Sequence, residues 1–345
     1  MDFQLLGKSG LRVSEIALGA MTFGTDFVWG APKEESRRIF DAYVDAGGNF
    51  IDTADGYMNG NSERMVGEFI SGQRERFVIA TKYTFSNRPG DPNSGGNHRK
   101  NMVQALEGSL SRLGVDYVDL YWVHAWDQLT PPEEMMRGLD DLVRAGKVLY
   151  IGISDAPAWI VSYSNAIAGL RGWSAFAGLQ IEYSLIERTP ERDLIPMANQ
   201  LGITVTAWSP LGSGLLSGKY KRNIKPEEGR VVQFQYVDLS DRNFDIAETV
   251  QAVAAEVDRT PAQVALSWVL RKGTIPIIGA RTLAQMQDNL ASLEVSLNDN
   301  QMARLDAVSA VSLGFPHDFL RAKFVNEHLH AGVFDRIKRN GASAR

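Results

Sequence analysis

The sequence contains no cysteine. This absence excludes disulfide frameworks, thiolate nucleophiles, cysteine-ligated zinc and iron–sulfur clusters. Apolar runs of transmembrane length are also missing, and the opening residues carry an acid, Asp2, where a signal peptide would carry basic charge. We therefore expect a cytoplasmic protein without a membrane partner.

The chain has no excess of positive charge either. Its 36 basic and 41 acidic residues give a net charge of −5, which argues against a broad nucleic-acid-binding surface. Of the 345 residues, 44% are hydrophobic, enough for a large core, and α/β barrels of this length fold as one unit. We expect a single domain over residues 1–345.

Short apolar runs alternate with amphipathic segments along the chain. Turn residues from Gly7 to Gly10 first predict an N-terminal β-hairpin. Eight runs follow: Ile16–Gly19, Asn49–Asp52, Phe77–Lys82, Val118–His124, Val148–Ser154, Gly178–Glu182, Ile203–Trp208 and Ile275–Gly279. Prolines such as Pro32, Pro131 and Pro261 begin the helical segments between them. This alternation implies parallel strands with right-handed crossovers and favours a (β/α)8 TIM barrel.

The rival fold is an open doubly wound sheet. If it bound a dinucleotide, it would carry G-x-G-x-x-G after its first strand, and residues 17–24 do not supply that pattern. The polar segment from Ser213 to Asn243 is long for a loop. We expect it to act as a flap over a ligand, with a variable surface loop without such a role as the alternative.

Ionisable residues end three neighbouring runs, and barrel active sites lie at the carboxyl ends of the strands. The second run ends in Asp52 with Tyr57 close behind, the third in Lys82 and the fourth in His124. Tyr57 suits donation of a proton to a carbonyl oxygen, because the Lys82 ammonium favours the phenolate and lowers a phenol pKa of about 10. Asp52 would hold Lys82 in place. His124 would donate a hydrogen bond to the substrate oxygen.

Seven segments carry a resemblance to a known family: Asn49–Tyr57, Ala80–Lys82, Asp119–His124, Gly152–Asp155, Gln180–Ser184, Ala207–Gly212 and Ile278–Thr282. Over nearly its whole length the sequence resembles the aldo-keto reductase superfamily. The resemblance implies reversible reduction of a carbonyl by a nicotinamide hydride, with the family's catalytic tetrad at Asp52, Tyr57, Lys82 and His124.

The resemblance also implies a set of cofactor contacts. They are Met21, Asp52, Ser154, Asp155, Gln180, Trp208, Ser209, Pro210, Leu211, Gly212, Ser213, Lys219, Gly279, Arg281, Gln285, Asp288 and Asn289. A guanidinium at Arg281 suits the extra phosphate of NADP, so we expect NADP(H) as the preferred cofactor, with NAD(H) as the other candidate. Most family members have Asn where this chain has Asp155. The sequence around Asp155 resembles the aryl-alcohol dehydrogenase branch of the family, in which Asp is usual at this position.

Aromatic residues near the predicted mouth favour an aromatic or bulky carbonyl or alcohol as substrate. The candidates for the substrate site are Phe23, Trp29, Tyr57, Tyr83, His124 and Trp126, with Phe85 and Trp122 close by. We predict no metal ion, since the pair His328 and His330 lies beyond the barrel strands. The sequence does not fix the oligomeric state.

Two other functions compete with the reductase. Some barrels of this family act as cofactor-binding regulatory subunits with vestigial activity, and the fold alone does not exclude this role. A barrel hydrolase would need an early His-x-His or paired strand-end carboxylates, whereas the fourth and seventh runs end in His124 and Trp208. The complete tetrad favours an enzyme of the reductase class.

Overall fold

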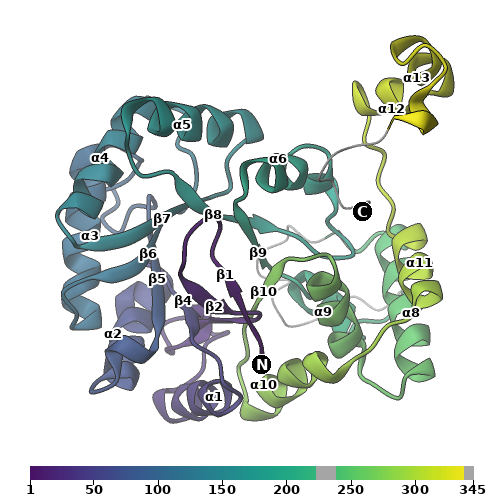
Figure 1. Cartoon of the computed structure of the whole chain (residues 1–345). Helices are drawn as coiled ribbons and strands as arrows, with labels where there is room; N and C mark the ends of the chain where they lie inside the picture. Colours follow the sequence, from purple (N-terminus) through teal and green to yellow (C-terminus); the bar gives the residue numbers. More distant parts are fainter. Residues whose placement is uncertain (223–237, 338–345) are drawn as a thin grey trace. The chain divides into compact units, whose positions relative to one another are not determined.

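Eight parallel strands close into a barrel in the computed structural model, which describes residues 1–222 and 238–337 (Figure 1). Each strand pairs with its neighbours in chain order, and the last pairs with the first. The strands are β3 (Ala17–Gly19), β4 (Phe50–Asp52), β5 (Val78–Tyr83), β6 (Val118–Val123), β7 (Val148–Ser154), β8 (Phe176–Glu182), β9 (Thr204–Trp208) and β10 (Ile275–Ile278). The predicted TIM barrel is confirmed, and every predicted run overlaps one of its strands; β5 and β8 extend beyond their runs, at Tyr83 and at Phe176.

Helices lie outside the strands and connect them (Figure 1). They are α1 (Lys33–Asp45), α2 (Asn61–Ile70), α3 (Arg99–Leu113), α4 (Pro132–Arg144), α5 (Ala158–Arg171), α6 (Leu194–Leu201), α8 (Asp241–Glu256), α9 (Pro261–Arg271), α10 (Leu283–Leu290) and α11 (Asp299–Val308). Their starts follow local chemistry. Thr260, for example, forms a capping box with Gln263 at the start of α9, which satisfies two backbone donors that the helix itself leaves free.

The interior of the barrel is filled by side chains, and Trp122 is the largest of them. It is fully buried, and Gly152 on β7 and Gly178 on β8 make room for its ring. A Cβ atom added at these glycines would come within 2.3 Å and 2.6 Å of the indole. Neighbouring strands therefore carry glycines where this tryptophan fills the barrel, and the ligand site must lie nearer the mouth.

The predicted N-terminal hairpin is also confirmed. Strands β1 (Phe3–Leu5) and β2 (Arg12–Ser14) pair antiparallel, and Leu6 and Val13 join a buried cluster with side chains from inside the barrel. The Gly7 N–H donates to the Thr204 hydroxyl at 2.7 Å, at the beginning of β9. The hairpin thus covers the amino-terminal end of the strands and leaves the opposite end for chemistry (Figure 1).

The chain divides into two compact units, Met1–Ser309 with the barrel and Ala310–Arg345. In the second unit the structure describes the short helices α12 (His317–Arg321) and α13 (Lys323–Leu329). The expectation of one domain over all 345 residues stays a prediction. Of the predicted flap, residues 223–237 lie outside the described part. None of the described helices has the length and apolarity needed to cross a lipid bilayer.

Candidate active site

Two adjoining cavities open at the carboxyl ends of the barrel strands. The larger, of about 690 Å³, is lined by predicted residues from five strands or the turns behind them: Asp52, Tyr57, His124, Ser154, Asp155, Gln180 and Trp208, together with Met21. The smaller, of about 380 Å³, shares Thr22, Ser209, Ile277 and Gly279 with it. Because they share these residues, the two cavities form one continuous groove.

Lys82 lies fully buried near the end of β5, and its ammonium group contacts three partners. It forms an ion pair with Asp52, and it donates to the Thr53 carbonyl at 2.9 Å and to the Tyr57 hydroxyl at 3.2 Å. Burial by itself lowers the pKa of Lys82, but Asp52 and Tyr57 raise it by more. Lys82 is therefore a fixed cation whose third contact is the phenol oxygen.

The Tyr57 pKa differs from the sequence-based expectation in its net direction. Burial raises it, and this effect outweighs the lowering by the Lys82 ammonium 3.2 Å away. The ammonium acts with the expected sign, but the sequence does not show how deeply the phenol is buried. The net result is a phenol that keeps its proton at neutral pH, as a proton donor must.

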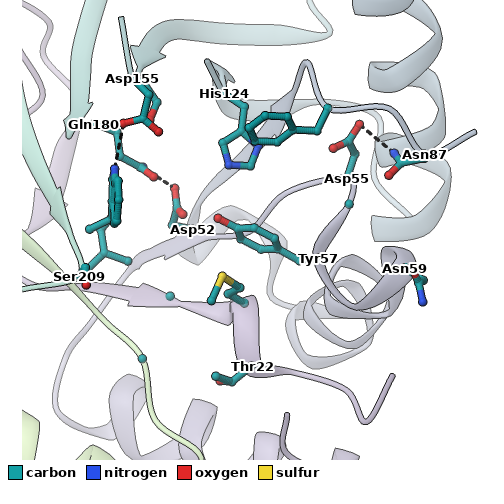
Figure 2. Close-up of a pocket in the computed structure, with 18 of the residues that line it drawn as sticks. Thr22, Asp52, Asp55, Tyr57, Asn59, Asn87, His124, Asp155, Gln180 and Ser209 are labelled. Carbon is teal, nitrogen blue, oxygen red and sulfur yellow. Dashed lines mark hydrogen bonds between the residues drawn. The ribbon is translucent and has the colours of Figure 1, made fainter. Parts of the chain in front are cut away.

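His124 follows β6 and faces the same cavity as Tyr57, with the two ring centroids 5.8 Å apart (Figure 2). Burial, and then the charge of Lys82, hold its pKa well below the usual 6.5. Its Nδ1 has no hydrogen-bond partner within the described residues. A neutral imidazole has one N–H to donate, so His124 can donate a hydrogen bond to a ligand oxygen without carrying charge.

On the other side of the cavity, two hydrogen bonds fix polar side chains (Figure 2). Gln180 donates to the second oxygen of Asp52 at 3.0 Å, so the carboxylate is held by both Lys82 and Gln180. The Trp208 indole N–H donates to Asp155 at 3.0 Å. The aspartate that departs from the usual asparagine therefore orients Trp208, a contact that the sequence did not predict.

Donors and small residues line the smaller cavity. Among the predicted residues it contains Ser209, Pro210, Leu211, Ser213, Lys219, Gly279, Arg281, Gln285, Asp288 and Asn289, whereas Gly212 is buried beside it. Asp288 also accepts from the Thr260 hydroxyl and the Gln263 amide at the start of α9. The side chain therefore has a structural contact in addition to its place in the cavity.

The predicted aromatic mouth is largely absent, because Phe23 and Tyr83 are fully buried in the core. Phe23 packs edge-to-face on Phe69 at 5.9 Å, and Tyr83 stacks on Tyr121 at 5.0 Å. Neighbouring residues of a strand point to opposite faces. Since Lys82 points into the barrel, Tyr83 must point into the layer between strands and helices.

Trp29 and Trp126 also lie outside the residues that line the larger cavity. Trp29 stacks on Phe27 at 5.4 Å, and Trp126 packs edge-to-face on Trp159 at 5.5 Å. Of the aromatic candidates on the loops, Phe85 does line the cavity, with its ring centroid 4.5 Å from that of His124. The mouth has one such ring where the sequence suggested several.

Polar residues outside the sequence-based prediction also line the larger cavity. They are Asp55, Asn59, Arg64, Ser86, Asn87 and Arg112. Asp55 lies between the predicted Asp52 and Tyr57, so a reading of every polar residue after the second strand would have found it. Arg112 belongs to α3, and no local pattern connects that helix with the mouth.

Comparison with known proteins identifies the family and several relatives of this chain. The aldo/keto reductase family model matches residues 15–310. A norsolorinic acid reductase of Emericella nidulans is 37% identical, and the match covers 90% of this chain and 82% of that protein. An aryl-alcohol dehydrogenase (NADP+) of Phanerodontia chrysosporium is 35% identical over 91% of this chain and 87% of its own length. A putative aryl-alcohol dehydrogenase of Saccharomyces cerevisiae is 31% identical, with 92% and 89% covered.

Proposed function

This chain belongs to the aldo/keto reductase family, and we propose that it reduces aldehydes or ketones to alcohols, reversibly, with NADPH as hydride donor and Tyr57 as proton donor. The observation that carries the proposal is the position of Lys82. This buried cation contacts Asp52, the Thr53 carbonyl and the Tyr57 hydroxyl at the edge of a cavity. The arrangement suits a reaction in which negative charge develops on an oxygen.

The smaller cavity supports NADP(H) as the cofactor through the chemistry of its donors. Arg281 and Lys219 both line it, and no described residue forms an ion pair with Arg281. Serines and glycines between Ser209 and Ser217 leave room for a ligand to approach the backbone. A guanidinium recognises phosphate oxygens through paired hydrogen bonds, and the relative from Phanerodontia chrysosporium carries NADP+ in its name.

In this mechanism, bound NADPH supplies the hydride that adds to the carbonyl carbon. Tyr57 gives its proton to the carbonyl oxygen as that oxygen gains negative charge. The Lys82 ammonium, 3.2 Å from the phenol oxygen, stabilises the phenolate that remains, and solvent returns the proton. His124, which faces the same cavity in its neutral form, donates a hydrogen bond that positions the carbonyl oxygen.

Bulky carbonyl compounds are the substrates that we propose. A cavity of about 690 Å³ has the size of a site for a drug-sized ligand. Relatives at 31–37% identity are named for aryl alcohols or norsolorinic acid, and Phe85 offers a ring at the mouth. Benzaldehydes and larger aromatic aldehydes are therefore the first compounds to test.

The proposal is tested by NADPH oxidation with nitrobenzaldehyde, using wild-type protein and Tyr57→Phe. We expect the substitution to lower turnover by about 100-fold or more while NADPH still binds, because the ring remains. Tyr83→Phe is the matched control, since it removes a buried tyrosine hydroxyl outside the cavity and should leave turnover near that of wild type. Near-normal turnover in Tyr57→Phe would refute the assignment of the proton donor, and failure of the wild type to oxidise NADPH with any aldehyde would favour a regulatory role.

A further inference from the structure

Asp55 is a buried carboxyl group that the proposed mechanism does not use. Its side chain is 4% exposed and lines the larger cavity. One oxygen accepts from the Asn87 amide at 3.2 Å, whereas Oδ1 has no hydrogen-bond partner within the described residues. A buried polar atom without a partner destabilises the fold, so such atoms call for an explanation.

No described residue forms an ion pair with Asp55. The charge of Arg112 acts on Asp55, but the Arg112 Nε forms an ion pair with Glu63 at 2.5 Å. Thr81 donates to the other Glu63 oxygen at 2.5 Å, so Glu63 and Arg112 satisfy each other. Burial, and then the charge of Glu63, raise the pKa of Asp55 to about 7, against smaller lowerings by Arg112, the Gly56 backbone N–H and the Asn87 amide.

Gly56, the next residue, keeps the space beside this carboxyl group open. Its φ of −90° is available to any residue, so the backbone does not require glycine here. A Cβ atom at this position would lie 3.2 Å from the Asn87 amide oxygen. Because Gly56 has no side chain, a ligand in the cavity can reach the Asn87 amide and the Asp55 carboxyl group.

Figure 2 shows Asp55 and Asn87 on one side of Tyr57 and His124, with Asp155 and Gln180 on the other. We propose that Asp55 and Asn87 form a second polar subsite, which binds a hydroxyl group of the carbonyl substrate away from the reacting carbon. This inference rests on the proposed carbonyl reduction and specifies its substrate class further. The Asp55 carboxyl group would accept a hydrogen bond from the hydroxyl group, and the Asn87 amide would offer a second polar contact.

The charges around the subsite favour a neutral hydroxyl group over an ionic one. Arg64 and Arg112 line the same cavity and would repel an ammonium group. Asp55 would repel a carboxylate or phosphate, and Arg112 is already paired with Glu63. A phenolic or alcoholic hydroxyl donates a hydrogen bond without bringing charge, so hydroxylated carbonyl compounds fit both conditions.

The experiment compares hydroxy- and methoxy-substituted benzaldehydes and naphthaldehydes, because a methoxy group fills similar space but donates no hydrogen bond. For the ring position that wild type prefers, we expect kcat/KM to favour hydroxyl over methoxy by about tenfold or more, the worth of a hydrogen bond to a charged group. Asp55→Ala should abolish this preference and leave the methoxy compounds nearly unaffected. Binding of the hydroxy and methoxy compounds is also measured without NADPH. Wild type should bind the hydroxy compound more tightly, and Asp55→Ala should lose this difference in affinity.

Asp91→Ala is the matched control. It removes a carboxylate from the loop that carries Asn87, outside the cavity, and should keep the wild-type ratio. If Asp55 had only a structural role, Asp55→Ala would lower the melting temperature. The hydroxyl-to-methoxy ratios of kcat/KM and of affinity would then stay unchanged. Removing a carboxyl oxygen without a partner should instead leave the melting temperature equal or higher.

If Asp55→Ala does not fold, Asp55→Val supplies the same comparison, since it also removes both oxygens but fills more of the space. Unchanged ratios in whichever variant folds would overturn the subsite, even if every aldehyde is reduced. Failure to reduce any aldehyde would contradict the proposed function, and the affinity ratios would still decide whether Asp55 binds the hydroxyl group.

Discussion

Lys82→Met separates the contribution of the buried ion pair to stability from its contribution to catalysis. In the folded protein Asp52 is 2% exposed and contacts Lys82 on one oxygen and the Gln180 amide on the other. Methionine has a similar length but no charge, so the substitution leaves a buried carboxylate with a single amide donor. Removing one partner of a buried ion pair costs about 3–5 kcal/mol, and we expect a loss in that range.

The free energy of unfolding, measured by urea titration at neutral pH, tests this figure. Turnover with an aromatic aldehyde should fall by about 100-fold or more as well, because Tyr57 loses the cation that stabilises its phenolate. The double variant Asp52→Asn/Lys82→Met removes both charges and keeps an amide oxygen at position 52. It should regain more than half of the lost stability, whereas its turnover should stay as low as that of the single variant.

Two results would refute this reasoning. If Lys82→Met unfolds at the same urea concentration as wild type, the ion pair does not hold the mouth of the barrel together. If the double variant is no more stable than Lys82→Met, the loss comes from packing and not from an uncompensated charge. Recovery of turnover in the double variant would instead contradict the role of the ammonium beside Tyr57.

Two further predictions concern pH and the cofactor. Because burial raises the Tyr57 pKa above its ordinary value of 10, carbonyl reduction, which needs the protonated phenol, should show no loss attributable to Tyr57 until the pH exceeds 10. Alcohol oxidation, which needs the phenolate, should rise with pH, and a Tyr57-dependent fall of reduction between pH 6 and 8 would contradict this. Arg281→Ala should weaken NADPH binding by about 1.5–3 kcal/mol and leave NADH binding nearly unchanged in fluorescence titrations, whereas equal losses would show that Arg281 does not contact the extra phosphate.

Much of the barrel and of the predicted tetrad could be read from the sequence because both are local signals. Each strand is a short apolar run between helical segments, and Asp52, Lys82 and His124 mark the carboxyl ends of three such runs. Parallel strands of a closed barrel must end at the same mouth, so residues on separate runs are brought together by topology alone. This is the step that needs no knowledge of packing.

The burial of Tyr83, which removes this ring from the predicted aromatic mouth, follows from the alternation of side chains along a strand. Tyr83 follows Lys82 within one strand, and alternation sends the two side chains to opposite faces. That signal was present in the sequence. The burial of Tyr57, which decides the net direction of its pKa shift, depends on packing around the mouth and has no comparable local pattern.

Asp52 and Asp55 show why residue type and position are not sufficient to assign a role. Asp52 is the last residue of β4, Asp55 comes three residues later, and both carboxyl groups are buried. Asp52 is held by Lys82 and Gln180, so its charge fixes the cation beside Tyr57. Asp55 accepts a hydrogen bond from the Asn87 amide and forms no ion pair with a described residue, because Arg112, on α3, is paired with Glu63. In the proposed mechanism, the partners, which only the tertiary structure reveals, therefore make one carboxylate a positioning group for catalysis and leave the other with an oxygen available to a substrate.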